Sequence, residues 1–116
     1  MKKIYHLGTC STNRRILAEI APGPDVALQD IKSDPLTPAQ LDGMKALSGS
    51  YAALFSKVAR KYRELGLASR ELTEADCRNY ILEDYTFLKR PVVIAGNRIF
   101  IGNAAATVKQ AADALK

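Results

Sequence analysis

The chain has 116 residues, of which 47% are hydrophobic and 25% charged, as in an ordinary globular protein with one core. It has no apolar run of the roughly 18 residues that a membrane-spanning helix needs, and its first residues lack the apolar segment of a signal peptide. We therefore expect a cytoplasmic protein with no membrane partner. The formal net charge is +5, but the basic residues are scattered outside 57–63 and match no nucleic-acid-binding motif, so we expect no nucleic-acid partner.

The chain contains only two cysteines, Cys10 and Cys77, and one histidine. The cysteines lie far apart and form no Cys-x-x-Cys pair, so we expect neither a zinc site nor a structural disulfide in a reducing compartment. Cys77 falls on the apolar face of a predicted helix, and its expected role is therefore to fill the core.

The first elements predicted along the chain are a strand, a helix and a second strand. Residues 4–7 are typical of a short buried strand, which Gly8 ends. Helix-capping residues at 11–13 and helical apolar spacing over 14–21 predict a helix, and residues 26–31 predict the second strand. Such a unit implies a parallel pair of strands and an α/β fold.

A helical stretch is predicted from about 38 to 88. Residues 37–40 form a capping box with proline at the first helical position, and the buried stripe of this helix would be Leu41, Met44 and Leu47. A second helix, ending near Gly66, is predicted from the spacing of Tyr51, Leu54, Phe55, Val58 and Tyr62. A third helix begins at 73–76.

The end of the chain predicts an antiparallel hairpin and a last helix. Its strands are 91–94 and 98–101, joined by a three-residue loop, and Asn103 is expected to cap the helix. The apolar stripe of that helix would be Ala104, Val108, Ala111, Ala112 and Leu115. The order of elements is that of a thioredoxin/glutaredoxin-like fold with an inserted helical subdomain, in a single domain over 1–116.

Cys10 is the residue best placed for chemistry, in the turn that leads into the first helix. The unpaired N–H groups and dipole at a helix N-terminus favour the thiolate form of such a cysteine. Arg14 adds positive charge, and His6 could donate a hydrogen bond from the strand end. Ser11 and Thr12 are expected to cap the helix and to line an anion site. The alternative is a buried structural cysteine at a strand–helix junction.

Four segments of the chain resemble the ArsC family, in order and in register. They are Tyr5-His6-x-x-x-Cys10-x-x-x-Arg14, Tyr62-Arg63-Glu64-Leu65-Gly66-Leu67, Lys89-Arg90-Pro91-Val92-Val93 and Ile101-Gly102-Asn103. This family covers glutaredoxin-coupled arsenate reductases and the related Spx and YffB-like proteins. The resemblance implies a thioredoxin-like fold with an inserted helical subdomain.

The resemblance also implies a reaction. Cys10 would attack arsenate, glutathione would join the adduct as co-substrate, and glutaredoxin or thioredoxin would recycle the mixed disulfide, with no bound cofactor. His6 would help the thiol to ionise, and Pro91 would be the cis-proline of the fold. Besides Cys10, His6 and Arg14, the candidate site residues are those that would bind the oxyanion or glutathione, namely Ser11, Thr12, Asn13, Lys57, Arg90, Pro91 and Asn103.

The chain also departs from the family pattern. Ser56 and Asn103 stand where the reductases have two further arginines, and Lys57 supplies charge without the planar guanidinium fork. The second cysteine of the Spx-type Cys-x-x-Cys switch is absent. We therefore carry an enzyme hypothesis, a single-cysteine thiol oxidoreductase, beside two others. One is an Spx-like regulator that binds RNA polymerase through the basic helical subdomain, and the other is a family member with an inert Cys10.

Overall fold

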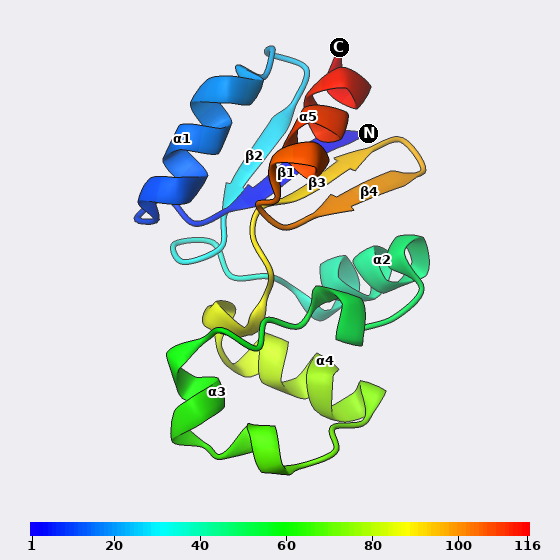
Figure 1. The fold of residues 1–116 in the computed structure, drawn as a ribbon. Coiled ribbons are helices and arrows are strands. Elements are labelled where there is room, and N and C mark those ends of the chain that lie inside the picture. The colour runs from blue at the N-terminus through cyan, green and yellow to red at the C-terminus, as the bar shows by residue number, and fades with distance from the viewer. The chain divides into compact units, whose positions relative to one another are not determined.

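The computed structural model describes all residues from Met1 to Lys116 (Figure 1). The chain divides into two compact units: the first combines Met1–Pro35 with Arg90–Lys116, and the second is Leu36–Lys89. The elements of the first unit are β1 (Lys2–His6), α1 (Ser11–Ile20), β2 (Ala27–Asp30), β3 (Val92–Ala95), β4 (Arg98–Ile101) and α5 (Ala105–Leu115). Those of the second are α2 (Pro38–Ser48), η1 (Ala52–Leu54), α3 (Arg60–Glu64), η2 (Leu67–Ser69), α4 (Glu74–Glu83) and η3 (Tyr85–Phe87).

The first unit is built on a four-stranded sheet with the order β2-β1-β3-β4. Strands β1 and β2 are parallel, and their register pairs His6 with Asp30. Strand β3 is antiparallel to both β1 and β4. The predicted sequence of strand–helix–strand, helical stretch and strand–strand–helix is therefore confirmed.

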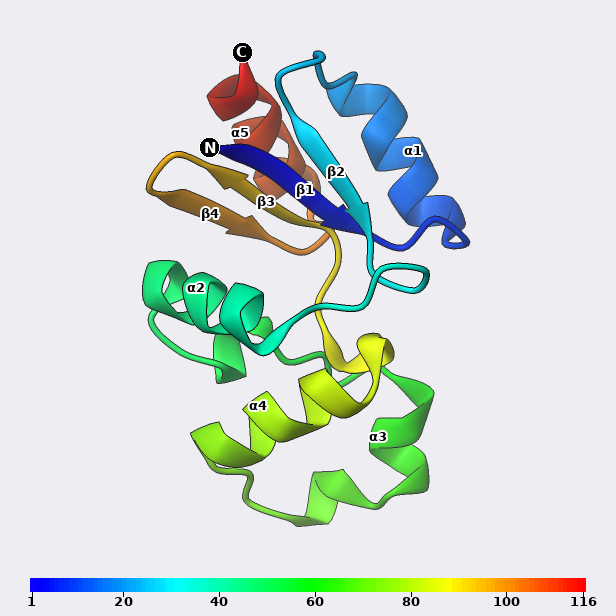
Figure 2. The same cartoon turned by 180° about the vertical axis from the view of Figure 1, so that it is seen from behind.

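Helices α1 and α5 cover one face of this sheet, as the view from behind also shows (Figure 2). The buried cluster on that face consists of Ile4, Val26, Val93, Phe100, Ala111 and Leu115, with Leu17, Ile20, Ala95 and Ala114 packed against it. The predicted stripe of the last helix is confirmed at Val108, Ala111 and Leu115, which are buried, whereas Ala104 precedes the helix and is exposed.

The hairpin has a tighter turn than predicted. Ala95 pairs with Arg98, so the loop consists of two residues, Gly96 and Asn97, rather than three. Gly96 has a φ of 63°, and a positive φ at the first central position is what a type II′ turn requires. This turn matches the twist of the flanking strands, which explains why the shorter loop forms.

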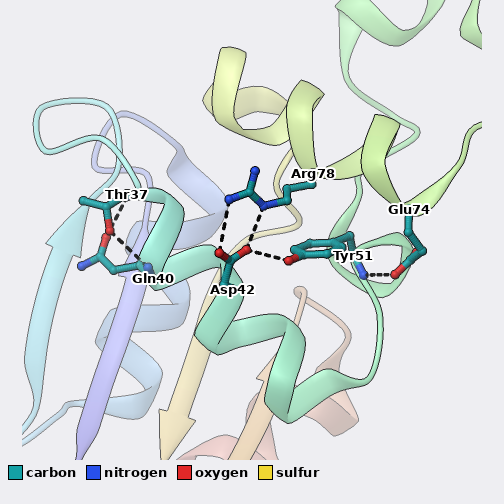
Figure 3. Close-up of polar contacts among 6 residues, drawn as sticks. All are labelled: Thr37, Gln40, Asp42, Tyr51, Glu74 and Arg78. Carbon is teal, nitrogen blue, oxygen red and sulfur yellow. Dashed lines mark hydrogen bonds and ion pairs between the residues drawn. The ribbon is translucent and has the colours of Figure 1, made fainter.

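The second unit contains the helical stretch predicted at about 38–88. Helices α2 and α4 begin with the predicted capping boxes, at Thr37 and Thr73. The Thr37 N–H donates to Gln40 Oε1 and the Gln40 N–H donates to Thr37 Oγ1, both at 3.1 Å (Figure 3). Of the stripe predicted for α2, Leu41 and Met44 are fully buried, but Leu47 is 37% exposed.

Side chains from three segments of this unit meet at Asp42 (Figure 3). Arg78 donates from Nε and Nη2 to its two carboxylate oxygens, at 2.8 and 3.2 Å, and the Tyr51 hydroxyl donates to Oδ1 at 2.6 Å. These donors lower the pKa of Asp42 to about 2. The carboxylate of Glu74 accepts the backbone N–H groups of Tyr51 and Ala52, at 2.8 and 3.0 Å. The network ties α2, η1 and α4 together.

The prediction of one helix over 51–62 is wrong. After η1 the chain becomes extended, forms a bridge between Phe55 and Leu88, and re-enters a helix only at Arg60. The Ser56 N–H donates to the Phe87 carbonyl at 2.7 Å, so a long-range backbone pairing replaces the helical one. The apolar spacing instead reflects an aromatic cluster of Phe55, Tyr62, Tyr80 and Phe87. Val58, assigned to the buried stripe, is 90% exposed.

Candidate functional site

Cys10 lies at the N-cap of α1, as the sequence predicted, and it is half-buried. Its φ and ψ of −87° and 119° are the extended values of a residue that precedes a helix. No side chain caps this helix, and its first turn carries no acidic residue. The prediction that Ser11 and Thr12 cap the helix is wrong, because they occupy its first two positions. The N–H groups of the first turn therefore have no capping side chain.

The loop that carries Cys10 is fixed by hydrogen bonds to its own ends. The Leu7 N–H donates to Asn13 Oδ1 at 2.9 Å, and the Cys10 N–H donates to the Leu7 carbonyl at 3.0 Å. The Arg14 N–H then donates to the Cys10 carbonyl at 3.0 Å. Asn13 is only 2% exposed. Its amide oxygen holds the end of the strand against the first helical turn, so the structure assigns this side chain to shaping the loop.

His6 ends strand β1, immediately before this loop. Side chains alternate along a strand, so His6 lies on the same face as Ile4, the face that α1 and α5 cover. Its ring nitrogen Nδ1 is buried and has no hydrogen-bond partner. Buried polar atoms are nearly always paired, and an exception is a candidate for a functional group.

Pro91 lies beside this histidine in the sheet. The peptide bond between Arg90 and Pro91 is cis, as the family resemblance implied. The register that pairs Tyr5 with Val92 places Pro91 opposite His6 when it is continued by one residue. The Pro91 carbonyl accepts the Gly102 N–H at 2.9 Å, so it is already engaged within the sheet. The carbonyl before the proline is that of Arg90, a half-buried residue.

The remaining predicted site residues are exposed. Arg14 lies in the first turn of α1, and Asn103 follows the end of β4. The prediction that Asn103 caps the last helix is wrong, because Ala104 occupies that position. Lys57 belongs to the second unit and is exposed there.

Within the first unit, the strand ends and helix starts gather the candidate residues at one end of the sheet. The carboxyl ends of the parallel strands β1 and β2 meet there, which is where open α/β sheets bind ligands. At this end His6 is the last residue of β1, Cys10 follows β1, and Arg90 and Pro91 precede β3. The arrangement combines a thiol, a helix N-terminus, an imidazole and a guanidinium, which suits attack on an anion or a disulfide.

Cys77 has a different environment. It is 4% exposed on α4, and its expected role in the core is confirmed. Burial raises the pKa of its thiol, and the carboxylates of Glu74 and Asp76 raise it further. A thiol held in this way is inert as a nucleophile.

Sequence reasoning missed Asp30, the last residue of β2. Its carboxylate accepts the backbone N–H of Lys32 at 3.1 Å and packs against Gly8 in the Cys10 loop. The hydrogen bond from Lys32 and the nearby Gly8 amide lower the pKa of Asp30, and the nearby His6 contributes to the same shift. The contact to Gly8 joins residues 22 positions apart (30 − 8), and only the parallel register of β1 and β2 brings them together.

Solved structures with the same architecture identify the fold. A protein named YFFB has 22% sequence identity and a TM-score of 0.78, with 100% of each chain covered. An arsenate reductase from Vibrio cholerae has 20% identity and a TM-score of 0.78, with 98% of this chain and 97% of that one covered. An arsenate reductase (ArsC) related protein from Brucella melitensis has 22% identity and a TM-score of 0.73, with coverage of 94% and 92%. The fold is thioredoxin-like, as predicted.

The family follows from the sequence itself. A sequence model of the ArsC family matches residues 5–111, nearly the whole chain, and the chain belongs to the ArsC family. This membership supports a thiol-dependent oxidoreductase as the class of protein. No curated protein matches the chain. None of its helices is long and apolar enough to cross a membrane.

Proposed function

We propose that this protein is a thiol-dependent reductase in which Cys10 is the nucleophile. The observation that carries the proposal is the position of Cys10 at the uncapped N-terminus of α1, where the first turn carries no acidic residue. The partial positive charge of a helix N-terminus favours a thiolate over a thiol and also attracts an anionic substrate.

The substrate is an oxyanion such as arsenate, or a disulfide. With arsenate, the Cys10 thiolate displaces water and forms a sulfur–arsenic bond. A glutathione thiolate then attacks the cysteine sulfur, so that the two sulfurs form a mixed disulfide and the arsenic takes up the electron pair as arsenite. Glutaredoxin or thioredoxin reduces that disulfide and restores the Cys10 thiol. With a disulfide substrate, Cys10 attacks one sulfur and expels the other as a thiolate.

The other site residues bind and orient these groups. The backbone N–H groups of Ser11 and Thr12 face the start of the helix and would hold an oxyanion. Arg14 and Arg90 would supply guanidinium charge, and His6 would exchange a proton with the thiol or the leaving group. With Asn103 and Ser56 where the reductases have arginines, fewer guanidinium groups are available to an oxyanion, which predicts weaker selection for arsenate.

The test is turnover by the Cys77→Ser variant, which leaves Cys10 as the only thiol. We expect arsenite production, or reduction of a glutathione mixed disulfide, that depends on glutathione and glutaredoxin. A trapped adduct of glutathione on Cys10 should be visible by mass spectrometry. Cys10→Ser should lose both, whereas wild type and Cys77→Ser should agree. Turnover that survives in Cys10→Ser, or the absence of both adduct and turnover in Cys77→Ser, would contradict the proposal.

A further inference from the structure

Asp30, the last residue of β2, contacts the backbone of the loop that carries Cys10. Its carboxylate lies against Gly8, which precedes Cys10 by two residues, and accepts the N–H of Lys32 at 3.1 Å. Two side chains from different elements thus hold the segment just before the cysteine. Asn13 on α1 accepts the Leu7 N–H at 2.9 Å, and the Asp30 carboxylate on β2 packs against the next residue, Gly8.

The contact is close enough to decide which residue can stand at position 8. A Cβ added to Gly8 would overlap the Asp30 oxygen Oδ2 and would lie 3.2 Å from Asp30 Cγ. The close approach of the carboxylate, rather than the backbone conformation, therefore requires glycine at position 8, because the φ of Gly8 is not positive. Any side chain there would push Asp30 and the loop apart.

Asp30 is itself held in place. Its carbonyl accepts the Asp34 N–H at 2.8 Å, and the Ile31 N–H donates to the His6 carbonyl at 2.9 Å, which continues the pairing of β1 with β2. The carboxylate is thus attached to a strand end whose backbone is held by hydrogen bonds, and its contact with Gly8 restricts the position of the loop. The same register makes Asp30 the strand neighbour of His6.

We infer that Asp30 is a positioning residue for Cys10, which fixes the Gly8 backbone so that the thiol stays at the N-terminus of α1. This inference rests on the proposed function, because it concerns the reactivity of the same cysteine. A misplaced reactive group loses rate steeply, by about a hundredfold for a displacement of about 1 Å.

The test uses Asp30→Ala and Asp30→Asn in the Cys77→Ser background. The readouts are the rate of Cys10 alkylation by iodoacetamide, the separate kcat and KM of turnover, and thermal unfolding, all at temperatures where the native state is fully populated. We expect Asp30→Ala to slow alkylation and kcat by about ten- to a hundredfold. Asp30→Asn keeps the size and shape of the side chain that packs against Gly8 and should stay within about threefold of the parent. Asp34→Asn, an exposed acid in the same turn, is the matched control and should change neither rate.

Gly8→Ala tests the same contact without touching the carboxylate. Gly8→Ala should lower the alkylation rate of Cys10 and kcat in the protein that has Asp30. In the Asp30→Ala background it should lower them little further, because the overlapping carboxylate is then gone. Additive losses in this double-mutant cycle would overturn the inference. So would an unchanged alkylation rate and kcat in Asp30→Ala with only the unfolding temperature lowered, or an equal loss in Asp30→Asn and Asp30→Ala.

The two proposals fail in different ways. If the parent Cys10 reacts no faster in the native protein than in urea and supports no turnover, the proposed function fails. If the parent reacts quickly and all Asp30 variants match it, the proposed function stands and the role of Asp30 is wrong.

Discussion

The longer helices of the two units begin differently, although the five-residue α3 of the second unit, which starts at Ala59, also lacks a side-chain cap. In the second unit, α2 and α4 start at Thr37 and Thr73, each with a complete capping box. In the first unit, α1 and α5 start at Cys10 and Ala104, and no side chain caps either helix. A side-chain cap satisfies N–H groups that would otherwise face solvent or a ligand. Side-chain caps thus occupy the starts of α2 and α4, whereas the N-cap position of α1 holds Cys10, the proposed nucleophile.

The two units are also held together in different ways. The first relies on strand pairing, with three adjoining strand pairs and one apolar cluster under α1 and α5. The second contains no sheet. It relies on an aromatic cluster, on the Asp42 network and on the Glu74 carboxylate. Truncation of a single side chain should therefore lower the free energy of unfolding most in the second unit. Each of the following substitutions tests this contrast.

The largest effect is expected for Phe87→Ala. Phe87 is 1% exposed and packs against Phe55 and Tyr80, with ring centroids 5.3 and 5.4 Å apart. Loss of this ring leaves a cavity and should lower the free energy of unfolding by about 3–5 kcal/mol, measured by urea denaturation. Val58→Ala, at an exposed position, should stay within about 0.5 kcal/mol. A similar small change for Phe87→Ala would mean that the aromatic cluster does not hold the second unit.

Glu74→Ala should have the next largest effect. It leaves the Tyr51 and Ala52 N–H groups without the carboxylate that binds both, and should cost about 1–2 kcal/mol. Glu74→Gln keeps one acceptor oxygen and should lose less. Glu71→Gln, at an exposed position on the loop before α4, is the control. Equal stabilities of Glu74→Gln and Glu74→Ala in urea would contradict the two-bond assignment.

The caps should respond in opposite directions in the two units. Thr73→Ala removes a cap and should destabilise the protein by about 1 kcal/mol. Cys10→Ser abolishes the proposed chemistry but supplies a good capping hydroxyl, and should stabilise the protein by about 0.5–1 kcal/mol. Thermal unfolding measures both. A Cys10→Ser variant less stable than wild type would show that the cysteine contributes to stability rather than occupying a cap position for its reactivity.

The smallest expected effect is the contribution of Asp42 to the pH dependence of the free energy of unfolding. Its pKa is lowered to about 2 by hydrogen bonds from Arg78 and Tyr51, whereas the unfolded chain has the ordinary value of about 3.8. The ionised form is thus favoured in the folded protein, so its stabilising contribution is present above about pH 4 and is lost as the pH falls through about 2. Urea denaturation should show Asp42→Asn less stable than wild type at neutral pH and nearly equal to it at about pH 2. A difference that persists in acid would contradict this assignment.

The sequence predicted the elements with strong local signals. The capping boxes at Thr37 and Thr73 and the turn before α1 could be identified because their signals lie within a few residues. The helix over 51–62 could not be excluded, because Phe55 and Leu88 form their bridge across 33 positions (88 − 55). The site showed the same limit. Cys10 stands out locally, whereas the contact of Asp30 with Gly8 depends on the register of two strands.

The most direct test of the account is the rate at which iodoacetamide alkylates Cys10 in the Cys77→Ser variant at neutral pH. We predict that the native protein reacts faster than the same protein unfolded in urea, because Cys10 stands at the start of α1, where no side chain caps the helix. Arsenate or oxidised glutathione should slow the native reaction by occupying or modifying the site. A native rate equal to or below the unfolded rate would contradict the central claim that this helix start activates Cys10.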